Sequence, residues 1–235
     1  MLVHDLWRTG CDWDDAIDEL SFRKWLRWTN ILADMPVFKL PRSYFGTARS
    51  NEIEEVQLHI FADASETAYG CVAYFRAIVR GKVVCSLVMS RAKVAPLKQL
   101  SIPWLELLAA VFAARVVFWI DAEVVLSWIR SDQRRYKQFV GFRIGEILSS
   151  TKLTDWRWVP TRLNVADLVT KWGKGLEIHT NSPWVRGQQF LYDSVEKWPK
   201  RELPPANTTE ELRVHLMLHD EQVARAIVDA NRFSK

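Results

Sequence analysis

The sequence has few cysteines and no long hydrophobic run, and both absences exclude classes of protein. Only three of its 235 residues are cysteine, and none lies in a Cys-x-x-Cys spacing, which argues against a disulfide framework and a zinc site. No apolar run approaches the roughly 18 residues that span a bilayer, and the N-terminal residues MLVHDLWRTG lack the apolar core of a signal peptide. We therefore expect an intracellular protein, cytoplasmic or nuclear, without a membrane partner.

The charge balance and the hydrophobic content exclude further classes. The chain carries 32 Lys and Arg against 28 Asp and Glu, a net charge of +4, and 49% of its residues are hydrophobic. These values are typical of a globular protein and exclude a disordered or collagen-like chain. Tryptophan is abundant, with 12 residues spread along the whole chain. That even spread favours packing anchors over a single stacking surface.

Hydrophobic periodicity divides the chain into three parts. Residues 1–52 predict a helix over 12–32, capped by Asp12 or Asp14, and then an irregular connection. Residues 53–175 predict strands and amphipathic helices in the order βββ-α-β-α-β-α, an α/β domain with a mixed five-stranded sheet and flanking helices. Residues 176–235 predict an extended linker and a final helix near 210–230. We therefore expect one central domain between two flanking segments.

Four acidic residues occupy special positions in this predicted order. Asp63 and Asp121 each follow an apolar strand, Glu106 lies in the first turn of a helix, and Asp167 lies in the first turn of the last helix. Functional groups of α/β sheets collect at strand ends and at nearby helix N-termini. If the first and fourth strands are adjacent and parallel, Asp63 and Asp121 end side by side.

Carboxylates that gather at one place point to a metal centre. They repel one another unless a cation compensates, and hard oxygen ligands select Mg²⁺ or Mn²⁺. Two such ions about 4 Å apart activate a water and stabilise the leaving oxygen in phosphodiester cleavage. The four acidic residues together therefore predict a two-metal site for that reaction.

Each acidic residue taken singly also has a purely structural interpretation. Asp63 in DASET fits an ordinary turn aspartate, and Asp167 comes three residues after Asn164, where an acidic residue stabilises a helix start. Glu106 lies in an apolar run where an unpaired carboxylate is costly to bury, although a helix can also turn one Glu to solvent. If the carboxylates are scattered, the chain is an interaction module without a site.

The central part of the chain contains four ordered blocks, FADASETAYGCVAYFR, SRAKVAPLKQLSIPWLELLAA, EVVLSWIRSDQRRYKQFVGFRIGEI and WRWVPTRLNVADLVTKWG. Together they resemble the ribonuclease H region of the BEL/Pao group of LTR-retrotransposon polyproteins. The opening HDLWRTGCDWDDAI resembles the stretch that joins the reverse transcriptase to this region, and PWVRGQQFLYDSVEKWP and IVDANRFSK resemble the run toward the integrase. The resemblance thus covers nearly the whole chain.

This resemblance implies a ribonuclease H fold and metal-dependent cleavage of the RNA strand of RNA–DNA hybrids. The implied catalytic and metal-binding set is Asp63, Glu106, Asp121 and Asp167, with two Mg²⁺ or Mn²⁺ ions as cofactors. The same region is sometimes grouped under a retrotransposon peptidase name. An aspartic protease, however, needs an Asp-Thr/Ser-Gly loop in each of two halves, and Asp63-Ala64-Ser65 lacks the glycine.

The resemblance also implies an organisation within a longer polyprotein. Residues 1–52 correspond to the tail of the reverse transcriptase or its connection, residues 53–175 to the ribonuclease H-like domain, and residues 176–235 to a linker and the start of the integrase-side segment. The implied partners are the RNA–DNA hybrid and these neighbouring polyprotein segments. We therefore expect the chain to be a fragment.

Two departures from the family bear on activity. Family members carry additional residues between the Glu-bearing helix and the next catalytic strand, whereas here residues 114–117 run directly into Phe118-Trp119-Ile120-Asp121. A helix rises about 1.5 Å per residue and a strand about 3.3 Å, so few residues remain for the chain to reverse direction between the Glu-bearing helix and the next strand. The helix must therefore be short, or Asp121 will be displaced. In addition, no histidine lies between Trp156 and Asp167, where many ribonuclease H enzymes hold one.

A basic tract with aromatic neighbours is the predicted nucleic-acid contact. Such a tract suits a phosphate backbone, although a solvated helix face with core aromatics explains it equally well. Among the aromatics, Trp128 is the best candidate for substrate contact. The tract comprises Trp128, Arg130, Arg134, Arg135 and Lys137.

Two functions remain open from the sequence. The first is an active hybrid ribonuclease. The second is a catalytically inactive, truncated retroelement remnant that serves only as a nucleic-acid-binding or interaction module.

Overall fold

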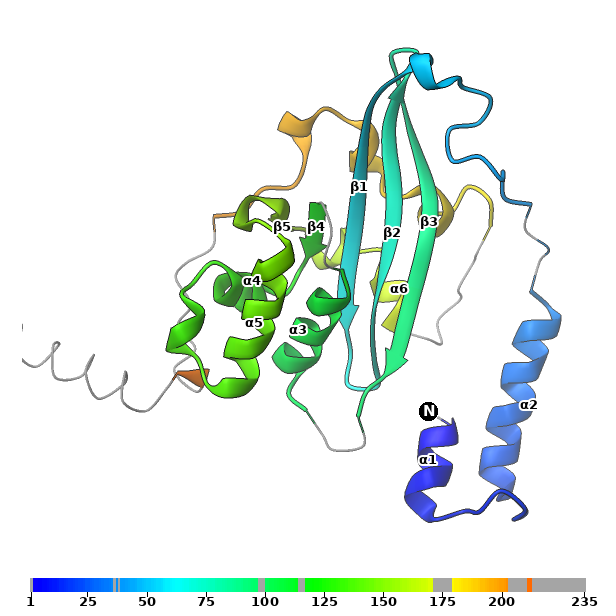
Figure 1. Ribbon diagram of the computed structural model, residues 1–235. Helices are drawn as coiled ribbons and strands as arrows, with labels where there is room; N and C mark the ends of the chain where they lie inside the picture. The colour runs from blue at the N-terminus through cyan, green and yellow to red at the C-terminus, as the bar shows by residue number, and fades with distance from the viewer. Residues whose placement is uncertain are drawn as a thin grey trace, which may run out of the picture.

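The computed structural model describes residues 2–35, 37, 39–96, 100–113, 117–170, 179–202 and 211–212. Its centre is one five-stranded sheet with the strand order β3-β2-β1-β4-β5 (Figure 1). The first three strands form an antiparallel meander, and β4 and β5 run parallel to β1. The strands are β1 (Ile53–Ala64), β2 (Ala68–Val79), β3 (Lys82–Val94), β4 (Val117–Ile120) and β5 (Trp156–Trp158). The predicted mixed α/β sheet is therefore confirmed.

Three helices cover one face of the sheet. They are α3 (Ile102–Ala113), α4 (Glu123–Ile129) and α5 (Gln138–Ser150). Their buried residues, such as Leu105, Trp128 and Ile144, pack on Ile60, Phe118 and other residues of that face. Short 3₁₀ helices connect the elements: η1 (Ser50–Glu52), η2 (Gln133–Arg135), η3 (Leu153–Asp155) and η4 (Thr161–Leu163).

The opposite face of the sheet is covered by the segment that the sequence predicted to be an extended linker. Its elements α7 (Pro183–Arg186), η5 (Gln189–Tyr192) and η6 (Val195–Lys197) follow α6 (Asp167–Thr170) in the chain. Phe190, Leu191 and Trp198 are buried there against Phe61 and Trp119. The linker prediction is wrong for residues 179–202, because short 3₁₀ turns carry buried aromatics without the helical or strand periodicity that marks an element.

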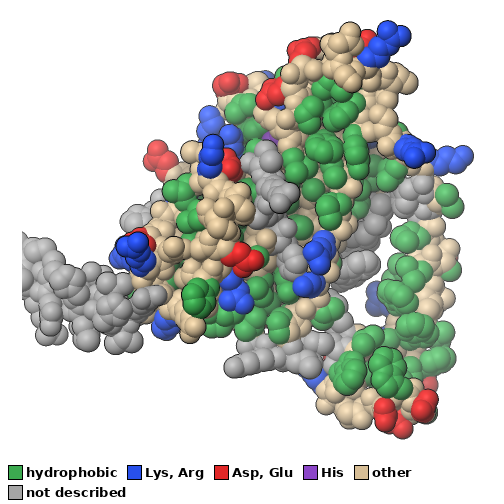
Figure 2. Space-filling view, viewed as in Figure 1, with side chains coloured by type: hydrophobic (Ala, Val, Ile, Leu, Met, Phe, Trp, Pro, Cys, Tyr) green, Lys and Arg blue, Asp and Glu red, His purple; other side chains and the backbone are tan. Residues whose placement is uncertain are grey.

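The N-terminal segment forms a separate helical hairpin. Its helices α1 (Leu2–Thr9) and α2 (Glu19–Ala33) contact each other and lie apart from the sheet (Figure 1). The N-cap of α2 is Asp18, whose carboxylate accepts from the Ser21 amide at 2.9 Å, so the predicted capping by Asp12 or Asp14 is wrong. Figure 2 shows hydrophobic side chains gathered over both helices.

Two further predictions are tested only in part by the described residues. The final helix predicted near 210–230 falls outside them except for residues 211–212, where Leu212 forms an isolated β-bridge with Tyr136. Within the parts of the chain that the structure describes, no helix combines the length and the apolar character needed to cross a membrane.

Candidate metal centre

The parallel pairing of β1 with β4 brings two of the four predicted acidic residues together. Phe61 pairs with Trp119, so Asp63 and Asp121 each lie two residues beyond the same rung, at the carboxyl edge of the sheet. Asp167 begins α6, which contacts β1 at that edge. One carboxylate oxygen from each of these three residues lies within 4.8 Å of the others. This is the spacing at which three oxygens can share a cation.

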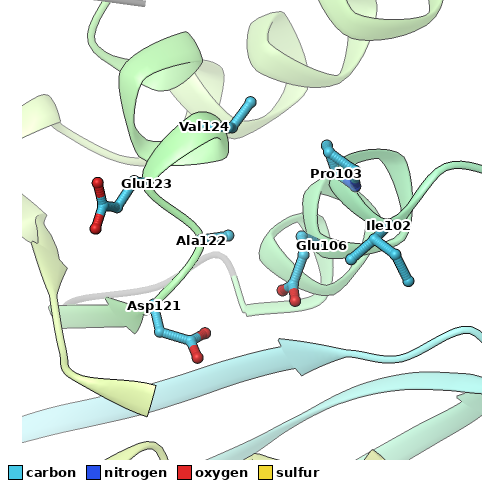
Figure 3. Close-up of a pocket in the computed structure, with 7 residues that line it drawn as sticks. All are labelled: Ile102, Pro103, Glu106, Asp121, Ala122, Glu123 and Val124. Carbon is cyan, nitrogen blue, oxygen red and sulfur yellow. The ribbon is translucent and has the colours of Figure 1, made fainter. Parts of the chain in front are cut away.

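Glu106 lies close to this group but outside it. It is the fifth residue of α3, in the second turn rather than the predicted first turn, and is 7% exposed. Glu106 and Asp121 line a common cavity of about 190 Å³, and Figure 3 shows their carboxylates turned toward the space between α3 and the loop after β4. The structure thus gathers three carboxylates tightly and places the fourth across a small cavity.

Asn164 and Thr170 support the acidic group, and the sequence reasoning missed these roles. The Asn164 side-chain amide donates to Asp121 Oδ1 at 3.0 Å and to the Ala62 carbonyl at 2.9 Å. Asn164 Oδ1 accepts from the Ala166 amide at 3.2 Å, so the residue shapes the turn before α6. Thr170 Oγ1 donates to Asp63 Oδ2. The run Asn164-x-Ala166-Asp167 lies in a block that resembles the family, but neither that resemblance nor the helix-start pattern predicts that Asn164 binds Asp121.

Burial raises the pKa of Asp63 to about 7. The charges of Asp167 and Asp121 raise the pKa further, whereas the hydrogen bond from Thr170 lowers it. A carboxyl with this pKa is partly protonated at neutral pH, and a cation that binds there displaces the proton. The all-oxygen donor set and this unfavourable accumulation of negative charge fit Mg²⁺ or Mn²⁺.

The shortened segment before Asp121 does not displace that residue. Helix α3 extends to Ala113 and β4 begins at Val117, while residues 114–116 lie outside the described part of the chain. The Asp121 carboxylate nevertheless lies within 4.8 Å of those of Asp63 and Asp167. The helix thus ends early enough for Asp121 to join the site, as the expectation required.

The residues of the predicted nucleic-acid contact divide into two kinds. Arg130, Arg134, Arg135 and Lys137 are exposed. Trp128 is 1% exposed, and its ring packs 6.1 Å from that of Tyr136 within the core. The prediction that Trp128 contacts substrate is therefore wrong, because a base cannot stack on a ring that the core already covers. The helical periodicity around Trp128 does not by itself distinguish a ring in the core from a ring that contacts substrate.

Comparison with known proteins finds one matching family model. The family model described as "Pao retrotransposon-like RNaseH-like domain" matches residues 1–132. The chain belongs to this family. The match includes Asp63, Glu106 and Asp121 of the Pao retrotransposon-like RNaseH-like domain, whereas Asp167 lies beyond it and joins the site through the tertiary structure. No curated protein matches the chain.

Two solved structures are similar to this Pao retrotransposon-like RNaseH-like domain over about half of the chain. The N-terminal RNase H domain of Rv2228c from Mycobacterium tuberculosis, solved as a fusion with maltose-binding protein, is 10% identical. The similarity covers 49% of this chain and 91% of that one, with a TM-score of 0.35. RNase H1 from the halophilic archaeon Halobacterium salinarum NRC-1 is 13% identical, with coverages of 48% and 92% and a TM-score of 0.32.

Proposed function

We propose that this RNaseH-like domain hydrolyses the RNA strand of RNA–DNA hybrids with two divalent ions, Mg²⁺ or Mn²⁺. The observation that carries the proposal is the convergence of Asp63, Asp121 and Asp167 within 4.8 Å. Membership in an RNaseH-like family supports the same reaction. Scattered carboxylates would have favoured an interaction module, and the gathered ones disfavour it.

Four carboxylates would hold the ions: Asp63, Asp121, Asp167 and, from across the cavity, Glu106. When bound, the ions supply an activated water and stabilise the leaving oxygen. The protein itself orients the carboxylates, because Asn164 holds Asp121 and Thr170 holds Asp63. Such supporting hydrogen bonds fix ligand geometry before the ion arrives.

Recognition of the hybrid would depend on its backbone and shape. Proteins recognise helical RNA mainly through groove shape, 2′-hydroxyls and phosphates, so no base-reading motif is required. We propose that the exposed side chains of Arg130, Arg134, Arg135 and Lys137 contact phosphates. These contacts would position the duplex without selecting a sequence.

The domain organisation is part of the proposal. Residues 1–52 would belong to the reverse-transcriptase side of a longer polyprotein, and residues 176–235 would lead toward the integrase. The ribonuclease H-like unit would begin at residue 53 and include residues 179–202, because that segment covers one sheet face. Such a polyprotein product would act in the cytoplasm or nucleus, where hybrids form.

A cleavage assay with matched carboxylate variants tests the activity. The chain is incubated with an end-labelled RNA–DNA hybrid in Mg²⁺, with EDTA as the metal-free control. We expect RNA cleavage that Asp63→Asn reduces at least about 100-fold, because that variant removes one charged metal ligand. Asp34→Asn, an exposed aspartate in the N-terminal hairpin, should cleave like the unsubstituted chain.

The negative outcome is equally informative. Cleavage by the unsubstituted chain that does not exceed the Asp63→Asn level would overturn the proposed hydrolysis. Hybrid binding without turnover would then support the catalytically inactive module as the function of this chain.

A further inference from the structure

A second cavity, of about 470 Å³, lies at the open edge of β5 and is strongly basic. Four cationic residues line it, and none of its described lining residues is acidic. Two indole rings, those of Trp156 and Trp158, form part of its wall. The four cations are Arg130, Arg157, Lys200 and Arg201.

The cations come from three separate parts of the chain. Arg130 caps the C-terminus of α4, Arg157 lies in β5, and Lys200 and Arg201 follow the buried anchor Trp198. The tertiary structure thus concentrates positive charge that the sequence spreads over seventy positions. Mutual repulsion of such a cluster is relieved when an anion binds.

Aromatic rings hold two of these cations in place. The Arg157 guanidinium lies 5.1 Å from the Trp198 ring centroid, and that of Arg201 lies 5.1 Å from the Trp158 ring. Cation–π contacts position a guanidinium without neutralising it, so the charge of Arg157 stays available to a ligand. The charge of Arg201 is compensated by Glu123, which lies 2.5 Å from its guanidinium.

The basic cavity adjoins the metal centre. Glu123, the partner of Arg201, lines the smaller cavity together with Asp121 and Glu106. Trp158 pairs with Ile120, the residue directly before Asp121, across the β4–β5 ladder. Adjacent strands lie about 4.8 Å apart, so an extended polyanion that reaches the metal centre can continue along the edge of β5.

We propose that this basic cavity binds the sugar–phosphate backbone of a nucleic-acid strand beside the metal centre. The inference rests on the proposed function in taking that strand to belong to the RNA–DNA hybrid. Arg130, Arg157 and Lys200 contact consecutive phosphates. The cavity therefore provides a second anchor, which shares Arg130 with the exposed tract and adds Arg157 and, from the segment after Trp198, Lys200.

Salt-dependent hybrid binding by the full chain tests this assignment. Fluorescence anisotropy of a labelled RNA–DNA hybrid is measured in EDTA, so that no metal-dependent turnover interferes, from 50 to 200 mM salt. Each lost phosphate contact should lower the slope of log K against log salt by about 0.7–0.9, which corresponds to about 5- to 8-fold weaker binding at 0.1 M salt. We expect this loss for Lys200→Ala and for Arg130→Ala.

Lys197→Ala is the matched control. Lys197 is an exposed lysine on the same segment and does not line the cavity, so its removal should leave the slope unchanged. Thermal melting of each variant confirms that the fold is retained. Unchanged slopes in Lys200→Ala and Arg130→Ala, or an equal loss in Lys197→Ala, would overturn the inference.

Two further arms separate this inference from its alternatives. Titration with inorganic phosphate alone tests a small-anion site: phosphate binding lost in Lys200→Ala, with hybrid binding intact, would overturn the backbone assignment. Cleavage is measured in parallel. Hybrid binding that depends on the cavity but yields no cleavage supports this inference and overturns the proposed hydrolysis. Cleavage with hybrid binding that does not depend on the cavity supports the hydrolysis and overturns this inference.

Discussion

At the residue scale, the ionised Asp63 carboxylate lowers the stability of the metal-free protein, although it is a candidate metal ligand. Its carboxyl is buried next to Asp167 and Asp121, and burial together with those charges raises its pKa to about 7. The unfolded value is about 3.9. The folded state therefore binds the proton more tightly, and the stability that this provides is complete below about pH 4 and lost as the pH rises through 7.

Asp63→Asn should consequently stabilise the metal-free protein at pH 8. The neutral amide removes a penalty of up to about 4 kcal/mol, and the gain should shrink toward pH 5. Thermal melting in EDTA at both pH values measures this difference. A gain that is the same at pH 5 and pH 8 would contradict the assigned cause.

Asn164→Ala should weaken metal binding without removing a ligand. The amide that holds Asp121 is 3% exposed, and its loss leaves the Ala62 carbonyl without this donor. We expect a loss of about 1–3 kcal/mol of stability and about 10- to 100-fold weaker Mn²⁺ affinity. Calorimetric titration with Mn²⁺ measures the affinity.

The exposed Asn181 provides the comparison for that experiment. Asn181→Ala should retain both the stability and the Mn²⁺ affinity of the unsubstituted chain. If Asn164→Ala also retained that affinity, Asn164 would not be a positioning residue for Asp121.

His59 is a buried group on the sheet face opposite α3. Its Nδ1 accepts from Trp119 Nε1 at 3.0 Å, and because an indole only donates, the ring proton lies on Nε2, which donates to Gln57 Oε1 at 3.0 Å. Burial, followed by the charges of Arg76 and Arg157, lowers the pKa of His59 to about 3. The unfolded chain therefore takes up the proton first as the pH falls.

This depressed pKa predicts acid sensitivity. The stability that neutral His59 provides is complete above about pH 6.5 and is lost as the pH falls toward 3, by about 2–3 kcal/mol at pH 4.5. His59→Gln should reduce that loss, whereas His179→Gln, at an exposed position, should not. Urea denaturation at pH 7 and pH 4.5 measures both, and an unaltered acid loss in His59→Gln would contradict the prediction.

At the element scale, the site depends on how closely α6 approaches the β1–β2 hairpin. Gly70 of β2 pairs with Asp63, and a Cβ built there would lie 2.7 Å from Val169 Cγ1 of α6 and still closer to the Arg91 carbonyl. Only glycine allows this approach. The same helix carries Asp167 and Thr170, so its position determines the geometry of the acidic group.

Gly70→Ala should therefore disturb both the fold and the site. Overpacking of this kind is destabilising by about 1–3 kcal/mol, and displacement of α6 should weaken Mn²⁺ binding as well. Thermal melting and Mn²⁺ titration report the two effects separately. A variant with normal melting and normal affinity would show that α6 does not require this contact.

The elements themselves were largely predictable, because period-two alternation and amphipathic spacing are local properties. The order βββ-α-β-α-β-α agrees with the described strands and helices of the central domain, except that two helices, α4 and α5, lie between β4 and β5. The local sequence pattern gave wrong predictions for two features that it does not determine. It predicted the N-cap of α2 at Asp12 or Asp14 instead of Asp18, and it predicted that Trp128 contacts substrate although the ring is buried.

At the scale of the whole molecule, the two flanking segments differ in their relation to the sheet. The segment after α6 buries Phe190, Leu191 and Trp198 on it. It also accepts, through the Leu191 carbonyl, a hydrogen bond at 2.6 Å from the buried Arg76 guanidinium. The N-terminal hairpin of α1 and α2 instead lies apart from the sheet (Figure 1).

Two truncations should therefore have opposite results. A chain that ends at residue 178 would expose Trp119 and leave Arg76 without its carbonyl acceptors, so we expect loss of cooperative unfolding. Removal of residues 1–40 should change the Tm by less than about 3 °C. Circular dichroism melting measures both, and a stable chain ending at residue 178 would contradict the assigned role of residues 179–202.

The sequence by itself determined the class of the domain, the succession of its elements and the four acidic positions, because these depend on periodicity and on short local blocks. The tertiary structure decided which groups meet. Pairing of β4 with β1 joins Asp63 to Asp121, Asn164 connects Asp121 to the turn before α6, and the segment after Trp198 completes a basic cavity at β5. Such contacts join residues far apart in the chain, and no local pattern encodes the packing that selects them.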